Sequence, residues 1–225
     1  MPPDVPLSFR HATTDDVPFI IECLLASEAS GTDIISYQRI FGLSEVELRD
    51  FFLQLAQEEM PGNAFSYVNY WIAEAPNGKK QVPVAGLAAW VEAEDEMLSN
   101  TQKAQALAYF LGIERWRAAN DKMQKAASID IERTVGSLQL DSIAVLPSYR
   151  GQGVLGHLIT YVLQWHKTHK PNVTQAEIIL MDDNVPARRA YEKAGFALLC
   201  ATHSDDPVVP TLLPGKGRLL MQRTL

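Results

Sequence analysis

The most informative stretch of the sequence spans residues 141–159 and reads Asp141-Ser-Ile-Ala-Val-Leu-Pro-Ser-Tyr-Arg-Gly-Gln-Gly-Val-Leu-Gly-His-Leu-Ile159. An alternating apolar run ends at Val145, and a proline, an arginine and three glycines then lead into an amphipathic run. This pattern predicts a strand, a tight turn and the start of a helix. Glycines leave the N–H groups at a helix N-terminus accessible, and these groups favour a phosphate. The stretch therefore predicts a site for a phosphate-bearing ligand.

Two other phosphate-binding patterns fit this glycine turn poorly. A P-loop needs Lys followed by Ser or Thr after its last glycine, whereas His157 follows Gly156. Gly151, Gly153 and Gly156 have the spacing of a dinucleotide fingerprint, but that site needs an acidic residue about 20 positions later, at the end of a second parallel strand. Residues 165–171 indicate the end of a helix instead. A dinucleotide is therefore disfavoured.

The rest of the chain carries short strands in hairpins and a few helices. Strands are expected at 7–12, 65–75, 82–92, 138–145, 176–181, 196–201 and 218–224, and helices from about 14, 44, 154 and 184. Residues 29–43 and 205–217 indicate loops, and 94–136 indicate a helical insertion with a helix at about 106–119. Helices do not alternate regularly with the strands. This order predicts the α+β class in one domain over residues 1–225.

Two segments together resemble the GCN5-related N-acetyltransferase (GNAT) family. Ser142-Ile-Ala-Val-Leu-Pro-Ser-Tyr-Arg-Gly-Gln-Gly153 is similar to its acyl-CoA motif, Arg/Gln-x-x-Gly-x-Gly/Ala at a strand-to-helix turn. Asn184-Val-Pro-Ala-Arg-Arg-Ala-Tyr-Glu-Lys-Ala-Gly-Phe196 looks like its second motif, an Asn-capped helix bearing a Tyr. The opening Phe9-Arg-His-Ala-Thr-Thr-Asp-Asp16 resembles its first strand and helix. The resemblance implies the GNAT acyl-CoA N-acyltransferase fold, a mixed, mostly antiparallel sheet flanked by helices, with the insertion at about 94–136.

The resemblance also implies a reaction. An acetyl group would move from acetyl-CoA to a primary amine of a small molecule, by direct attack in a ternary complex and without a metal. The residues expected to contact acetyl-CoA are Ile143, Ala144, Val145, Arg150, Gly151, Gln152, Gly153, Val154, Leu155, Gly156, Asn184, Ala187 and Tyr191.

These contacts divide by chemistry. The N–H groups of residues 152–156, with the charge of Arg150, would hold the diphosphate. Backbone groups of Ile143 and Val145 would bind the pantetheine arm, and an N–H near Ile143 would polarise the thioester carbonyl. Asn184 would contact the donor, cap its helix, or do both.

Two side chains are candidate catalytic groups. Tyr191 resembles the family's general acid and would protonate or hydrogen-bond the leaving CoA sulfur; otherwise it is a core aromatic. Many members carry a glutamate base on the strand before the loop, and Gln139 occupies that place. Asp141 lies two residues further on the same strand face and would accept the amine proton, or would only orient the amine or cap a neighbouring group. Leu155 stands where the family has a small residue, so one diphosphate contact is expected to differ.

Three alternatives remain open at this point. The acceptor is a protein or peptide amine, the donor carries a longer acyl chain, or the chain is a non-catalytic CoA-binding module in which Gln139 and Leu155 mark lost chemistry. The net charge of −7 disfavours a nucleic-acid partner. The sequence shows neither a membrane-spanning run nor a signal peptide, which predicts a cytoplasmic protein without a membrane partner. A homodimer is possible.

Four further side chains are given simple structural roles. Cys23 and Cys200 lie in apolar runs and are expected to be buried and reduced. His166 and His169 share one face of the predicted helix, lack companions at metal-ligand spacing, and are expected to be solvated.

Overall fold

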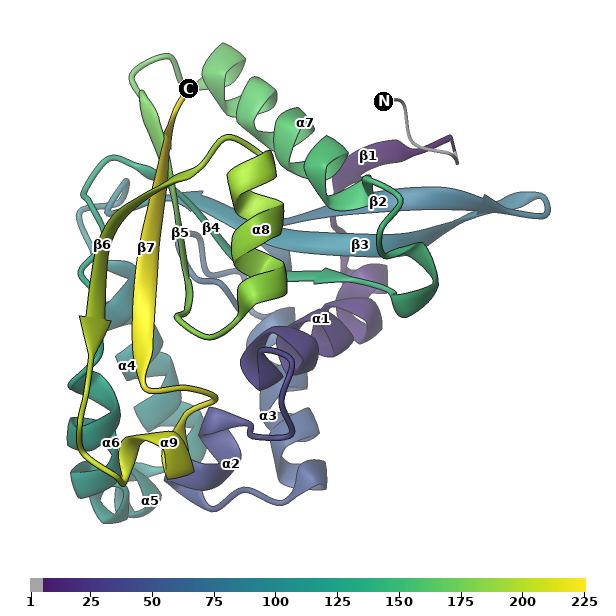
Figure 1. The fold of residues 1–225 in the computed structure, drawn as a ribbon. Helices are drawn as coiled ribbons and strands as arrows, with labels where there is room; N and C mark the ends of the chain where they lie inside the picture. Colours follow the sequence, from purple (N-terminus) through teal and green to yellow (C-terminus); the bar gives the residue numbers. More distant parts are fainter. Residues whose placement is uncertain (1–5) are drawn as a thin grey trace.

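A seven-stranded sheet in the order β1-β2-β3-β4-β5-β7-β6 organises the computed structural model, which describes residues 6–225 (Figure 1). The parallel pair is β4 and β5, and the other neighbouring pairs are antiparallel. This confirms the predicted α+β class with a mixed, mostly antiparallel sheet. The strands are β1 (Ser8–His11), β2 (Tyr70–Asn77), β3 (Lys80–Val91), β4 (Leu138–Val145), β5 (Gln175–Met181), β6 (Ala197–His203) and β7 (Gly217–Thr224).

Helices cover both faces of this sheet. They are α1 (Val17–Ala29), α2 (Ser36–Phe41), α3 (Glu45–Gln57), α4 (Ser99–Leu111), α5 (Ile113–Ala118), α6 (Asn120–Ala127), α7 (Val154–His169), α8 (Val185–Lys193) and α9 (Val209–Leu212). Figure 1 shows α7 and α8 on one side and α1 and α3 on the other. Within residues 6–225, no helix combines the length and hydropathy of a membrane span.

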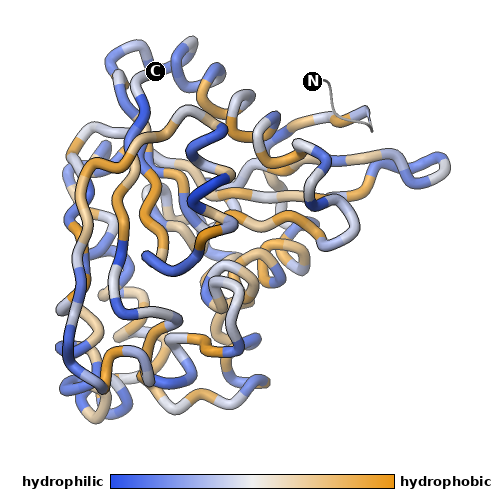
Figure 2. The backbone as a smooth tube through the Cα atoms, in the orientation of Figure 1, coloured by the Kyte–Doolittle hydropathy of each residue, from blue (hydrophilic) through white to orange (hydrophobic). Residues whose placement is uncertain are grey.

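Alternating strand residues build a core on each face. On β2, Trp71 packs with Leu158 and Val162 of α7, whereas the neighbouring Tyr70 packs with α1 and α3 on the opposite face. All of these side chains are at most 2% exposed. Figure 2 shows the corresponding apolar stretches along the central strands and α1. The two cores fix the helices that carry the site described below.

Local signals set several helix starts as predicted. Ser44 Oγ accepts from the Glu47 N–H at 3.2 Å, and the Glu47 carboxylate accepts from the Ser44 N–H at 2.9 Å, which is the expected capping box of α3. Asn184 caps α8 through its Oδ1, which accepts from the Ala187 N–H at 3.2 Å. Each cap satisfies backbone donors that the first turn leaves free.

β4 changes partners along its length. Its parallel pairing with β5 runs from Leu138 to Leu140 and ends there. Its pairing with β3 continues to Val145, across an irregularity opposite Gly86 and Ala88. Ser142 lies at this irregularity with φ 48°, a left-handed conformation that is uncommon outside glycine. The result is a widening gap between β4 and β5 beyond Leu140.

Three element predictions were wrong. Residues 29–43 contain helix α2, and 205–217 contain the short helix α9. The insertion holds three helices instead of one, because Gly112 adopts φ 80° and ends α4 inside the predicted helix at 106–119.

Two side-chain predictions were also wrong. Cys200 is exposed, because β6 is an edge strand that no helix covers in residues 6–225, whereas Cys23 is buried as expected. His166 is buried at 4% exposure, and His169 is exposed. The face of α7 that packs on β2 is wider than the apolar residues alone indicate.

Candidate active site

The gap between β4 and β5 is the first feature of the site. Beyond Leu140, β4 keeps β3 on one edge, so its N–H and C=O groups on the other edge face the gap. This segment contains three half-buried residues that are expected to contact acetyl-CoA: Ile143, Ala144 and Val145. A backbone edge of this kind can accept an extended, amide-bearing chain as a strand would.

The glycine turn lies at the far end of β4. Gly151 and Gly153 adopt φ 77° and 78°, which other residues reach only with strain. Gly153 is the N-cap of α7, so the N–H groups of the first turn have no partner inside the helix. Arg150 turns back and donates from Nε to the Val145 carbonyl at 3.0 Å. The turn thus presents free N–H groups and one guanidinium at the mouth of the gap.

Leu155 and Gly156 explain how the turn departs from the family pattern. Leu155 is half-buried and packs against the core beneath α7. Gly156 lies within the first turn of α7, and a Cβ added there would meet no atom of the described chain within 4 Å. The side chain of Leu155 therefore points toward the core, and Gly156 lies on the exposed side of α7.

The second motif approaches the gap from β5. Asn184 uses its Oδ1 as the α8 cap and donates from Nδ2 to the Ser30 hydroxyl at 2.9 Å. Its capping role is thereby confirmed, and it ties α8 to the end of α1. Tyr191 lies two turns further along α8 at 7% exposure, and burial raises its pKa above the usual 10. Its hydroxyl stays protonated at neutral pH.

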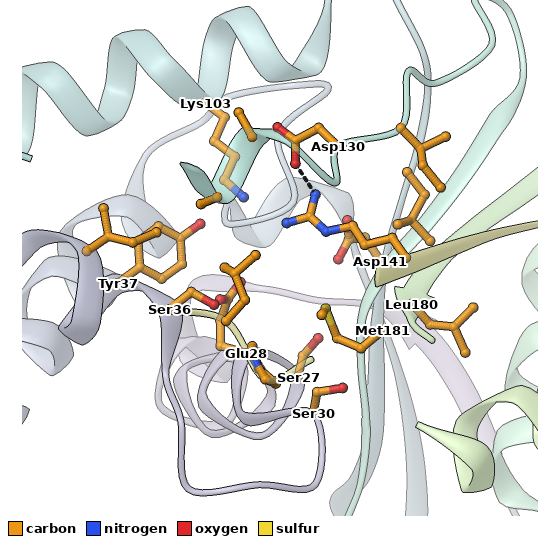
Figure 3. A pocket seen from close by; sticks show the side chains of 18 of the residues that line it. Ser27, Glu28, Ser30, Ser36, Tyr37, Lys103, Asp130, Asp141, Leu180 and Met181 are labelled. Atoms are coloured by element: carbon orange, nitrogen blue, oxygen red, sulfur yellow. Dashed lines mark hydrogen bonds and ion pairs between the residues drawn. The ribbon is translucent and has the colours of Figure 1, made fainter. Parts of the chain in front are cut away.

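A cleft of about 450 Å³ joins these parts (Figure 3). Five residues predicted from the sequence line it together: Asp141, Ile143, Asn184, Ala187 and Tyr191. The remaining walls come from α1, α2, α4, α5, α6, the chain that follows α6, the end of β5, and the chain at the start of β7. Residues 150–156 lie outside the lining, at the other end of the gap. The predicted residues therefore separate into a phosphate end and a reaction end.

Asp141 is held by a cation. Its Oδ2 lies 2.5 Å from Arg133 Nη2, and its Oδ1 accepts from the Ser142 N–H at 2.5 Å. Arg133 Nη1 donates to Gln139 Oε1 at 2.6 Å, so Gln139 and Asp141 do share one strand face. Gln139 Nε2 in turn donates to the fully buried Glu177 at 2.9 Å. Gln139 is thus part of an internal network and does not line the cleft.

Sequence reasoning missed five charged side chains of the cleft. They are Glu28, Lys103, Asp130, Arg133 and Arg218. Asp130 and Arg218 form an ion pair. Burial raises the pKa of the Glu28 carboxyl above its usual 4.5. One signal was present: Glu28 follows Leu24 by four residues and so continues the buried face of α1 with a carboxylate.

Comparisons with known proteins concern a family model and the overall fold. Residues 126–196 match the model of the acetyltransferase (GNAT) family. No curated protein sequence matches the chain significantly. The structure of an N-acetyltransferase from Staphylococcus aureus Mu50 is similar over 96% of this chain and 100% of its own, at 14% identity and a TM-score of 0.60.

Two further solved structures are similar across nearly their whole length. A Drosophila melanogaster polyamine N-acetyltransferase, which catalyses the formation of N-acetylagmatine, covers 98% of this chain and 100% of its own, at 13% identity and a TM-score of 0.55. Arabidopsis thaliana NAA60 in complex with acetyl-CoA covers 98% and 99%, at 16% identity and a TM-score of 0.53. At these identities the likeness concerns the fold. Residues 126–196, which contain both motifs, thus match the GNAT family of acetyltransferases, and the fold of the described chain is similar to that of solved acetyltransferases.

Proposed function

We propose that this protein is an N-acetyltransferase that moves an acetyl group from acetyl-CoA to the primary amine of a small molecule, by direct attack in a ternary complex. The observation that carries the proposal is the gap beyond Leu140, which connects the glycine turn with the cleft. A donor bound along β4 has its diphosphate at the turn and its thioester at the cleft.

The chain's own groups suit the donor along its length. The first-turn N–H groups of α7 and the Arg150 guanidinium bind the diphosphate. The free edge of β4 at residues 143–145 binds the amides of the pantetheine arm. Asn184 and Ala187 border the thioester end from α8. Binding thus fixes the thioester beside Tyr191 and Asp141.

Tyr191 acts on the leaving group. The neutral amine attacks the thioester carbon, the C–N bond forms and the C–S bond breaks. The ammonium loses one proton before the attack, and the amine nitrogen loses a second proton after it. This second proton reaches the CoA sulfur, and the Tyr191 hydroxyl either passes it on or donates a hydrogen bond to the sulfur while it arrives. The raised pKa of this buried phenol favours the hydrogen bond, because a phenol that is less acidic than the CoA thiol keeps its proton while it stabilises the developing thiolate.

Asp141 remains the proposed partner of the amine. Of its two possible roles, the geometry favours orientation over proton abstraction, because Arg133 already engages one carboxylate oxygen and the Ser142 N–H engages the other. The first amine proton then leaves through another carboxylate of the cleft or through water. The cleft volume of about 450 Å³ suits a small acceptor.

Thiol release from acetyl-CoA across a panel of amines tests the proposal. A Cys200→Ser background keeps the protein's own exposed thiol from reacting with the thiol reagent. We expect Tyr191→Phe to lower kcat by roughly a hundredfold or more while the acetyl-CoA Kd stays within about twofold. Tyr109→Phe, at an 81% exposed tyrosine, is the matched control. Weaker acetyl-CoA binding with unchanged kcat would reject the role. Tight binding without release to any amine would favour a non-catalytic module.

A further inference from the structure

Most charges in the cleft are matched within the protein. The lining has three carboxylates and three cations: Glu28, Asp130, Asp141, Lys103, Arg133 and Arg218. Asp141 pairs with Arg133, and Asp130 pairs with Arg218. Glu28 and Lys103 are different, because neither lies within 4 Å of an opposite charge in residues 6–225. Lys103 attracts Glu28 across the cleft without an ion-pair contact, so this anion and this cation are the two that a ligand can engage.

Glu28 is fixed at the reaction end of the cleft. It lies in the last turn of α1, and the neighbouring Ser30 accepts the hydrogen bond from Asn184 at the start of α8. Helix α8 also carries Tyr191. Glu28 is thus on the side from which the amine must reach the thioester.

Lys103 reaches the same space from another element. It lies on α4, and its Nζ is 5.4 Å from the ring centroid of Tyr37 and 5.3 Å from that of Phe65. These rings hold the ammonium by cation–π attraction without neutralising its charge. Figure 3 shows Lys103 and Glu28 facing the same part of the cleft from α4 and α1.

Electrostatics then restricts the acceptor. Half-buried charges are costly without a partner, and a bound opposite charge relieves that cost. A polyamine would satisfy Glu28 but add positive charge beside Lys103, in a cleft whose six formal charges already cancel. A ligand with both an ammonium and an anionic group satisfies both side chains.

We propose that the acceptor is a zwitterionic amine, an amino acid in its simplest form, whose ammonium binds Glu28 and whose carboxylate binds Lys103. The proposal rests on the N-acetyltransferase function and names its substrate class. It separates this chain from an enzyme for polyamines, although the fold is similar to that of one.

Matched pairs of amines that differ only by a carboxylate test the proposal. Suitable pairs are arginine with agmatine, lysine with cadaverine, and phenylalanine with phenethylamine. We expect kcat/KM for at least one amino acid to exceed that of its partner by about tenfold or more. Lys103→Met should reduce this preference to about threefold or less by raising the KM of the amino acid, and should leave the plain amine within about twofold. Lys167→Met, at an exposed lysine of α7, should leave the preference intact.

Two results would overturn the inference. One is a plain amine that equals or exceeds its amino acid in every pair, and the other is an equal loss for both members in Lys103→Met. Calorimetry with the CoA-bound protein makes the same comparison without turnover. A binding preference without thiol release would refute the acetyltransferase function and keep the zwitterion site, whereas turnover without the preference would do the reverse.

Discussion

His166 should make the stability of this protein depend on pH. It lies on the face of α7 that packs on β2, and its Nδ1–H donates to the Val162 carbonyl at 2.9 Å. Burial lowers its pKa from 6.5 to about 4, with Lys170, His11 and Glu94 as the charged or titratable groups nearby. The folded protein therefore resists the proton that the unfolded chain accepts.

The sign and size of the effect follow from this difference. The contribution of His166 to the free energy of unfolding is fully present above pH 6.5 and is lost as the pH falls toward about 4. Each pH unit in this window is worth about 1.4 kcal/mol, so the free energy of unfolding should fall by about 3 kcal/mol from this one group. Carboxylates add their own pH dependence, so the contribution must be isolated with a variant.

Urea unfolding between pH 4 and 8 measures it. His166→Leu cannot titrate, and its free energy of unfolding should vary with pH less steeply than that of the wild type below pH 6.5. His169→Leu removes an exposed histidine one turn further along α7 and should keep the wild-type slope. Equal slopes for the wild type and His166→Leu would refute the assignment of the effect to this buried ring.

Three other outcomes are expected. Gly156→Ala should raise the free energy of unfolding by up to about 1 kcal/mol, because the position is helical and open, yet weaken acetyl-CoA binding by roughly tenfold if the diphosphate approaches this turn. An unchanged acetyl-CoA Kd would remove Gly156 from the donor site. Glu28→Gln should abolish the rise of kcat/KM with pH above 4.5, because burial raises the pKa of that carboxyl, whereas Asp141→Asn should keep it. The opposite pattern in the pH profiles would return the base role to Asp141. Cys200 should react with a thiol reagent in the native protein, and Cys23 only after unfolding, because burial raises its pKa to about 12. Equal reaction rates of Cys23 and Cys200 in the native protein would contradict the burial of Cys23.

The donor half of the site could be predicted from the sequence because short-range chemistry sets it. Gly151 and Gly153 are needed for positive φ at a turn, and Asn184 caps a helix through a donor three residues away. The strand before the turn alternates with period two. Each of these signals lies within about ten residues, so neighbours along the chain determine the outcome.

The acceptor half could not be predicted, because it exists only after distant elements meet. Glu28 and Lys103 are 75 positions apart, on helices whose approach depends on the core between α1, α3 and the insertion. Helix α2 is six residues long and carries only three apolar side chains, too short a pattern to distinguish from a loop. The prediction that His166 is exposed to solvent was wrong for a similar reason. Trp71 of β2 packs against His166, so the extent of the buried face of α7 depends on β2 and cannot be derived from the residues of α7 alone.

The contacts of Gln139 give a structural explanation for the glutamine at this position. In the sequence it occupies the position where many GNAT members carry a catalytic glutamate. One explanation for the glutamine was that the protein has lost catalytic activity. In the structure its Nε2 donates to Glu177 at 2.9 Å, where a glutamate would place a second carboxylate against a buried one. Although burial opposes it, hydrogen bonds from Thr134 and Gln139 hold the pKa of Glu177 below its usual 4.5, so this carboxylate stays ionised. Glutamine at 139 therefore fits the network that positions Arg133, which is a structural reason for its presence. The proposed mechanism therefore assigns proton transfer to the carboxylates of the cleft.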